Sequence, residues 1–281
     1  MTPSRRTSIS TGQVADGRLD EAAQRLLNAA RSGVPCAPVR DLIGRDDIDA
    51  AYAVQQRVIA TATVAGATVI GRKIGLTSAV VQAQLGVDRP DFGVLLHDMQ
   101  REESTPVAIT DLLQPRIEAE VAFVLGADLY EGPLDVDAVR AAVAHAVAAL
   151  EIVDSRIAGW DISFGDTVAD NASSGLFVLG TTTRSLEEVD PVSVQMTMSE
   201  NGEEVSTGNG AACLGDPLEA LAWLARTARD FGEPLRAGQV ILSGALGPMV
   251  PVKPGATYTA ALTGLGQVSA TFTAHDQEPH A

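Results

Sequence analysis

Two glutamates lie two positions apart inside an apolar segment, residues 116–124 (RIEAEVAFV). If this segment is a strand, alternate side chains share a face, so Glu118 and Glu120 project together from one side. Two carboxylates about 7 Å apart along a strand repel each other and are costly to desolvate. A bound divalent cation would offset both costs. An edge strand with a solvated acidic face is the alternative, and this segment alone leaves both open.

A third carboxylate, Glu151, occurs in a second apolar run, residues 150–154 (LEIVD), about 30 residues farther along the chain. Carboxylate oxygens are hard ligands that suit magnesium, manganese or calcium. Histidine ligation is not indicated, because the four histidines are scattered along the chain: His97, His145, His275 and His280. The third carboxylate therefore favours an oxygen-ligated metal.

Two further segments contain side chains that could move protons. Lys73 is flanked by glycines and apolar residues in residues 69–78 (VIGRKIGLTS), near an expected strand-to-helix turn. It could be a desolvated acid or base, or a surface lysine whose stem lies along apolar neighbours. Asp88 and Asp91 belong to a turn-rich segment, residues 86–93 (GVDRPDFG), for which a solvated turn is the simpler interpretation.

Glycines follow Ser243 in residues 243–249 (SGALGPM), after a short expected strand. They would allow backbone amides to approach an anion, although a tight structural turn explains them equally well. The polar segment 166–175 (DTVADNASSG) reads as a loop whose Asp or Asn side chains cap helices and turns.

The elements that must position these residues form two groups. Helical spacing of apolar residues predicts helices over residues 18–32, 47–62, 136–149 and 217–231. Short apolar runs bounded by Gly and Pro predict strands over residues 117–125, 150–153, 176–179, 192–198, 240–242, 258–262 and 268–272. Strands outnumber long helices and do not alternate with them regularly. This pattern favours an α+β fold with a mostly β core.

We predict a helical N-terminal portion over residues 1–65 and a catalytic domain over residues 66–281. Residues 1–16 and 275–281 are expected to be frayed tails.

Composition narrows the function classes. The 281 residues include 46% hydrophobic residues and carry a net charge of −16. A strongly acidic surface argues against nucleic acid as a partner, and it requires a local positive centre if the substrate is an anion. No stretch approaches the about 20 apolar residues of a membrane span, and no apolar segment of a secretory signal follows the polar start. We therefore expect a cytoplasmic protein, not bound to membranes, whose Cys36 and Cys213 are free thiols.

Six strings, in order, resemble the 2-keto-4-pentenoate (2-hydroxypenta-2,4-dienoate) hydratases of the fumarylacetoacetate hydrolase superfamily. They are GRKIGLTS (71–78), QLGVDRPDFG (84–93), LQPRIEAEVAFVL (113–125), LEIVDSRI (150–157), DTVADNASSG (166–175) and GEPLRAGQVILSGALGPMV (232–250). The resemblance extends over residues 18–273. It implies a β-rich roll of the fumarylacetoacetase C-terminal type, preceded by the helical portion and assembled into homo-oligomers.

The resemblance also assigns roles. It implies that Glu118, Glu120 and Glu151 bind Mg²⁺ or Mn²⁺, that Lys73 is an active-site residue, and that Asp91 lies near the substrate. Lys73 and Asp91 are the expected acid/base pair.

Leu76 and Ser243 are the expected substrate-binding residues. The implied reaction is addition of water to 2-hydroxypenta-2,4-dienoate, which gives 4-hydroxy-2-oxopentanoate during meta-cleavage degradation of aromatic compounds. The alternative is a 4-oxalocrotonate (2-oxo-3-hexenedioate) decarboxylase of the same superfamily. Neighbouring pathway enzymes are possible partners.

Overall fold

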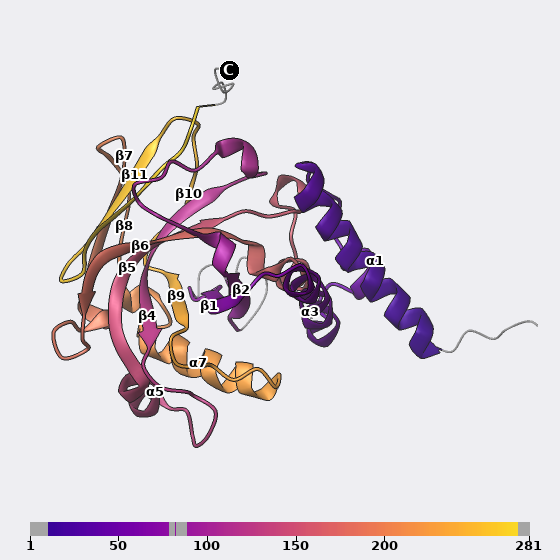
Figure 1. Cartoon of the computed structure of the whole chain (residues 1–281), viewed down its shortest axis with the longest axis horizontal. Coiled ribbons are helices and arrows are strands. Elements are labelled where there is room, and N and C mark those ends of the chain that lie inside the picture. Colours follow the sequence, from indigo (N-terminus) through magenta and orange to yellow (C-terminus); the bar gives the residue numbers. More distant parts are fainter. Residues whose placement is uncertain (1–10, 79–81, 83–88, 275–281) are drawn as a thin grey trace, which may run out of the picture.

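The computed structural model describes residues 11–78, 82 and 89–274 (Figure 1). Three helices precede the first strand and are α1 (Thr11–Ser32), α2 (Arg40–Ile43) and α3 (Ile48–Val64). Among the described residues, no helix is both long and apolar enough to span a bilayer. In Figure 1, α1 and α3 lie together on one side of the molecule, beside the strands.

Side-chain caps set the starts of the long helices. Asp47 accepts a hydrogen bond from the Ala50 amide and begins α3. Asp216 caps α7 (Pro217–Asp230) in the same way, with Pro217 in the first turn. The predicted helices over residues 47–62 and 217–231 are thereby confirmed. The prediction of a frayed tail over residues 1–16 is wrong for residues 11–16, which belong to α1. Residues 1–10 and 275–281 lie outside the described residues.

The larger sheet curls back on itself. Its strands follow the order β2-β1-β9-β4-β5-β6-β3, with β10 paired to β4. The two outer strands, β2 and β3, are separated only by the 3-10 turn His97–Met99, so opposite ends of the sheet must come together. The strands are β1 (Val69–Gly75), β2 (Asp91–Leu96), β3 (Gln100–Arg101), β4 (Arg116–Leu125), β5 (Val143–Val153), β6 (Ser174–Arg184), β9 (Val240–Ala245) and β10 (Val250–Pro251).

A four-stranded antiparallel sheet completes the β core, in the order β12-β11-β7-β8. Its strands are β7 (Gln195–Glu200), β8 (Glu203–Asn209), β11 (Thr257–Leu262) and β12 (Gly266–Thr271), and β12 packs against β6. Two short helices complete the set, α5 (Val136–Ala142) and α6 (Phe164–Ala169). The helical start and β-rich remainder confirm the predicted α+β class.

One predicted helix is half wrong. Residues 136–149 were expected to be helical throughout, but α5 ends at Ala142 and Val143 begins β5. The cause is burial on both faces. Every residue of β5 from Ala146 onward is buried, so its alanines and valines show no apolar–polar alternation, and alanine has the highest helix propensity. The strands β1, β2 and β8 and the two-residue strands β3 and β10 were not among those predicted.

The helical portion packs directly on the β core. The Tyr52 ring of α3 stacks on Phe92 of β2 at 4.7 Å between centroids. The buried Gln55 amide donates hydrogen bonds to the carbonyls of Phe92 and Val168. One core cluster of buried residues extends from Ala22 in α1 to Phe272, which directly follows β12. The division into two domains near residue 65 stays a prediction.

Candidate active site

Three glutamates converge at one end of the β4–β5 pair. Glu118 and Glu151 face each other directly across the two strands, and Glu120 lies two positions along on the same face of β4. Carboxylate oxygens from the three side chains lie within 4.8 Å of one another. Glu120 and Glu151 are buried, whereas Glu118 is half-buried at the edge of a pocket. The structure therefore brings the three predicted metal ligands together.

The cluster has acceptor atoms that the protein does not use. One oxygen of Glu120 accepts a hydrogen bond from the Gly244 amide at 2.7 Å, but Oε1 has no hydrogen-bond partner. Oε2 of Glu151 has no partner, and Oε1 contacts only the ammonium of Lys73, at 3.2 Å. Buried acceptors are normally paired, and unpaired like charges are costly. Convergent, unpaired carboxylate oxygens fit a divalent cation that prefers oxygen ligands.

Protonation of the metal-free cluster follows from the same crowding. Burial, reinforced by the charge of Glu151, raises the pKa of Glu118 to about 7. Burial and the charges of Glu151 and Glu118 raise the pKa of Glu120 well above its ordinary value. The cluster therefore holds protons near neutral pH until a cation replaces them.

Lys73 lies against this cluster. Its side chain is buried, and Nζ is 3.2 Å from Oε1 of Glu151. Burial alone would lower the pKa of Lys73, but the surrounding carboxylates, Glu151 and Asp91 first, outweigh it and raise the pKa above its ordinary value. This placement excludes the surface-lysine interpretation.

Asp91 reaches the same point from β2. The antiparallel register of β1 and β2 places Asp91 opposite Gly75. A Cβ atom at Gly75 would lie 2.2 Å from Oδ1 of Asp91 and 3.4 Å from Nζ of Lys73, so only glycine leaves room there. Oδ1 has no hydrogen-bond partner, and burial raises the pKa of Asp91 to about 6. The predicted solvated turn is wrong for Asp91, while Asp88 lies outside the described residues.

A pocket opens beside Lys73, Asp91 and Glu118, and we call it the substrate pocket. Its empty volume is about 600 Å³, including its opening to solvent. Leu76 lines it with an unusual positive φ of 57°. Strained conformations of this kind cluster at functional sites.

The placement of Ser243 differs from the expectation. Ser243 is fully buried and is not among the residues that line the substrate pocket. The amide of Gly244, which could have held an anion, donates instead to Glu120. Substrate binding by Ser243 therefore stays a prediction, and this neighbouring amide is already engaged.

Several pocket residues in and around α6 were not predicted from the sequence. Thr167, Ala172 and Ser173 line the substrate pocket, as does Trp160. Asn171, Ala172 and Ser173 have positive φ angles of 53°, 50° and 52°. The Asn171 side chain accepts from the Val94 amide and donates to the Val94 carbonyl, so this segment also supports β2. The segment DTVADNASSG was noticed in the sequence but was interpreted only as capping residues.

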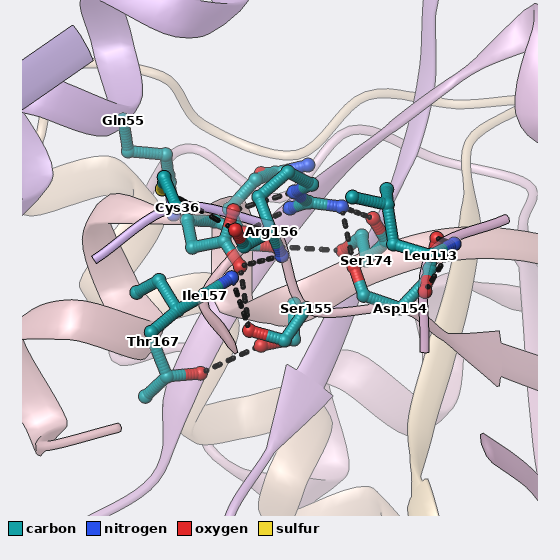
Figure 2. Close-up of polar contacts among 12 residues, drawn as sticks. Cys36, Gln55, Leu113, Asp154, Ser155, Arg156, Ile157, Thr167 and Ser174 are labelled. Atoms are coloured by element: carbon teal, nitrogen blue, oxygen red, sulfur yellow. Dashed lines mark hydrogen bonds and ion pairs between the residues drawn. The ribbon is translucent and has the colours of Figure 1, made fainter. Parts of the chain in front are cut away.

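A network of ion pairs and hydrogen bonds holds Asp170, the residue before this pocket-lining turn. Arg156 donates to Asp170 through Nε at 2.5 Å and through its backbone amide at 3.0 Å. The same guanidinium donates to the carbonyls of Asp154 and Ser174. Figure 2 shows Arg156 at the centre of these contacts, with Ser155 and Thr167 nearby. The network ties the end of β5 to the pocket-lining turn.

The comparisons with known proteins cover most of the chain. The family model described as fumarylacetoacetate (FAA) hydrolase C-terminal matches residues 60–273. This chain belongs to the fumarylacetoacetate hydrolase family. The matched region includes the three clustered glutamates, Lys73 and Asp91.

Curated relatives within the family are more specific. The chain is 53% identical over 256 residues to the "TodF product hydratase" of Pseudomonas putida F1. The aligned region covers 91% of this chain and 96% of that protein. It is 53% identical over 253 residues to the "2-keto-4-pentenoate hydratase" of Paraburkholderia xenovorans, covering 90% and 94%. These relationships confirm the resemblance to the hydratases.

A solved structure of the family matches the fold closely. The 4-oxalocrotonate decarboxylase from Pseudomonas putida G7, complexed with magnesium and adipate, has a TM-score of 0.87 and 34% sequence identity. The match covers 95% of this chain and 100% of that chain. Hydratase and decarboxylase members of the family thus share this architecture.

Proposed function

We propose that this chain is a hydro-lyase that adds water to 2-hydroxypenta-2,4-dienoate to give 4-hydroxy-2-oxopentanoate. The observation that carries the proposal is 53% identity, over nine-tenths of the chain, with a protein named 2-keto-4-pentenoate hydratase. The site contributes a buried lysine and a buried aspartate beside a cluster of unpaired carboxylates. We also propose that the chain acts in the meta-cleavage degradation of aromatic compounds, in which such a dienoate arises.

Glu118, Glu120 and Glu151 are the proposed ligands of a divalent cation, magnesium or manganese. When bound, the cation supplies a Lewis acid and a positive charge for an anionic 2-oxo or 2-hydroxy acid. The unpaired oxygens, Oε1 of Glu120 and Oε2 of Glu151, and the half-buried position of Glu118 support this assignment. Because the whole chain carries a charge of −16, attraction of an anion depends on such a local centre.

Lys73 and Asp91 are the proposed acid/base pair. In the reaction the 2-hydroxyl loses its proton as C5 gains one, and water then supplies a hydroxyl to C4 and a proton to C3, so proton carriers must lie beside the substrate. Both side chains line the substrate pocket, and both belong to strands, which hold them in place. Burial brings the pKa of Asp91 to about 6, close to the working range of an acid or base. The charged ammonium of Lys73 can donate a proton and orient the substrate carboxylate.

The experiment is a product analysis with two substrates. The purified chain is supplied with magnesium or manganese and incubated separately with 2-hydroxypenta-2,4-dienoate and with 2-oxo-3-hexenedioate. We expect 4-hydroxy-2-oxopentanoate from the first and little carbon dioxide from the second. Rapid release of carbon dioxide, without hydration of the pentadienoate, would instead support the decarboxylase alternative, which the 34% identical solved structure favours.

Several accompanying predictions rest on the family resemblance. Substrate binding by Leu76 and Ser243, assembly into homo-oligomers, contact with neighbouring pathway enzymes and a cytoplasmic location stay predictions. The choice between magnesium and manganese can be made by reconstituting the metal-free protein with each ion. Sedimentation of the purified chain would test the oligomeric state.

A further inference from the structure

The substrate pocket has a tryptophan in its wall. Trp160 lines it together with Lys73, Asp91 and Glu118, and the residue is half-buried. Among the described residues that line this pocket, Trp160 is the one aromatic residue. An indole has a flat, apolar face that suits a planar ligand. The metal ligands and the acid/base pair do not hold the carbon chain of a substrate, and this ring is placed to do so.

The backbone at Trp160 has an uncommon conformation. Gly159 and Trp160 have φ angles of 66° and 56°, and a positive φ is an outlier for a side chain as bulky as tryptophan. The turn is tied to Gln114, whose Oε1 accepts a hydrogen bond from the Gly159 amide at 2.6 Å. The side-chain nitrogen of Gln114 in turn donates to the carbonyls of Ser155 and Ile157. Strain of this kind persists where neighbouring contacts determine the conformation, and here it places the indole at the pocket.

Two contacts fix the ring itself. Nε1 of Trp160 donates a hydrogen bond to the carbonyl of Gln114 at 3.1 Å. The guanidinium of Arg116 lies over the ring, with Cζ 4.7 Å from the ring centroid, which is a cation–π contact. Among the described residues, no carboxylate forms an ion pair with Arg116, so the ring is the partner of this charge. One face of the indole is therefore covered, and its position is set before a ligand enters.

The strand that contains Arg116 connects this contact to the carboxylate cluster. Arg116 begins β4 two residues before Glu118, and alternate strand residues share a face, so both side chains point to the same side. The residue opposite Arg116 on β5 is Val153, which also lines the substrate pocket. The pairing of β4 with β5 therefore fixes the indole relative to the cluster, where the acid end of a substrate would be held.

Resting on the function proposed above, we infer that Trp160 positions the substrate, because its indole packs against the conjugated chain of the dienoate, and that Arg116 acts through Trp160 by holding the ring. Electrons can pass from the 2-oxygen to C5 only while C2 to C5 stay coplanar. A rigid, flat surface favours that planar form, and little entropy is lost on binding because the ring is already fixed. Lys73 and Asp91 then meet a chain whose carbons are held in one plane.

Binding of two unreactive acids tests the inference. Sorbate (2,4-hexadienoate) has the planar diene of the substrate but no 2-hydroxyl, so it cannot ketonise. Hexanoate has the same number of carbons in a flexible, saturated chain. In calorimetry with the magnesium-loaded parent, sorbate should bind about three- to tenfold more tightly than hexanoate, the range expected for packing on an aromatic ring. Equal binding of the two acids, or binding of neither, overturns the inference.

Fluorescence shows whether the ligand touches the ring. The chain has two tryptophans, and Trp223→Phe leaves Trp160 as the single emitter while it keeps an aromatic ring in α7. Sorbate does not absorb where tryptophan emits, so quenching of Trp160 requires contact. We expect saturable quenching by sorbate, with the dissociation constant that calorimetry gives for the same variant, and little quenching by hexanoate. Binding of sorbate without quenching overturns the inference.

Variants at the two positions locate the effect. In Trp160→Leu the preference for sorbate over hexanoate should be lost, whereas Trp160→Phe, which keeps an aromatic ring, should retain it to within about twofold. Arg116→Met removes the cation and should reduce the preference by about twofold or more. A preference that is unchanged in Trp160→Leu overturns the inference, and one unchanged in Arg116→Met overturns the role of Arg116. The fluorescence measurement keeps Trp160 in place, so it decides the inference even if Trp160→Leu does not fold.

The inference and the proposed function fail in different ways. Hydration of 2-hydroxypenta-2,4-dienoate by the parent is measured separately. If hydration occurs but sorbate is not preferred, only the positioning role of Trp160 fails. If sorbate is preferred and quenches Trp160 but no hydration occurs, the proposed function fails and the contact with the ring stands.

Discussion

Two groups of buried carboxylates lie within the same fold and differ in how they are satisfied. Asp166 and Asp170 are 0% and 1% exposed, and Glu120 and Glu151 have the same values, 0% and 1%. Both oxygens of Asp166 and of Asp170 accept hydrogen bonds from amides, hydroxyls or arginines. Of the four oxygens of Glu120 and Glu151, two have no partner at all, and a third, Oε1 of Glu151, contacts only the ammonium of Lys73.

The difference distinguishes two uses of a buried charge. The aspartates hold chain segments together, because Asp166 binds the start of α2 and Asp170 binds Arg156. The carboxylate oxygens of the glutamates converge within 4.8 Å of one another, and Lys73 and Asp91 lie beside them. Burial alone therefore does not identify a functional carboxylate. The useful criterion is burial together with unpaired oxygens.

The largest expected effect concerns Lys73. Lys73→Met keeps the length and apolar stem but removes the charge and the proton. We expect turnover of 2-hydroxypenta-2,4-dienoate to fall by about two to four orders of magnitude, the usual range for a lost acid or base. Metal affinity, measured by calorimetry, should change little.

Arg72→Met is the matched control for that variant. Arg72 is the adjacent residue, is also buried, and pairs with Glu233 outside the site. Successive strand residues point to opposite faces, so the Arg72 side chain lies away from the site. The turnover of Arg72→Met, per folded molecule, should therefore stay within about threefold of that of the parent. If both methionine variants lose activity equally, Lys73 has no role beyond packing.

The next effect is on stability and separates the two groups of carboxylates. Asp170→Asn leaves the largely buried Arg156 without its counter-ion, so we expect the free energy of unfolding to fall by about 3 kcal/mol. Burial and the neighbouring carboxylates raise the pKa of Glu120, so Glu120→Gln replaces a carboxyl that favours its neutral form with a neutral amide of similar size, and the metal-free protein should lose no stability. Chemical denaturation of the two variants in chelator provides the measurement. A larger loss in Glu120→Gln than in Asp170→Asn would contradict the comparison.

The smallest effect is a pH dependence in the metal-free protein. The pKa of Glu118 is raised to about 7 when the chain is folded, against about 4.3 in an unfolded chain. A raised pKa means that the stabilising contribution is present below about pH 4.3 and is lost as the pH rises through 7. Because Glu118 is partly exposed, we expect a loss of only about 1–2 kcal/mol relative to Glu118→Gln.

Denaturation of the parent and of Glu118→Gln at pH 5 and pH 8, in chelator, measures this difference. Saturating magnesium should remove the loss in the parent, because metal ligands must be deprotonated and the cation then offsets their repulsion. A difference between the two proteins that is constant with pH would mean that Glu118 is not perturbed.

Local sequence patterns were sufficient to predict much of the fold and part of the site. Period-two spacing in residues 116–124 correctly placed Glu118 and Glu120 on one face, and the helix predicted from Asp47 does begin with Asp47 as its cap. The central strand β5 was partly misread, since burial on both faces removes the alternation that identifies a strand.

Contacts between distant segments could not be predicted in this way. Asp91 meets Lys73 because of the β1–β2 register, which is set by tertiary packing and not by either segment alone. The left-handed turn at Ala172 and Ser173 was missed for a related reason, because nothing in those residue types favours positive φ. Only the resemblance to a family linked Asp91 to the site in advance.

The central claim is that unpaired buried carboxylates, and not buried carboxylates in general, hold a divalent cation. The most direct measurement is a calorimetric titration of magnesium into the parent, Glu120→Gln and Asp170→Asn at pH 8, where fewer protons compete with the cation than at neutral pH. We predict one ion per chain in the parent, affinity at least about tenfold weaker in Glu120→Gln, and affinity within about threefold of the parent in Asp170→Asn. Equal magnesium affinity in the parent and in Glu120→Gln would contradict the claim.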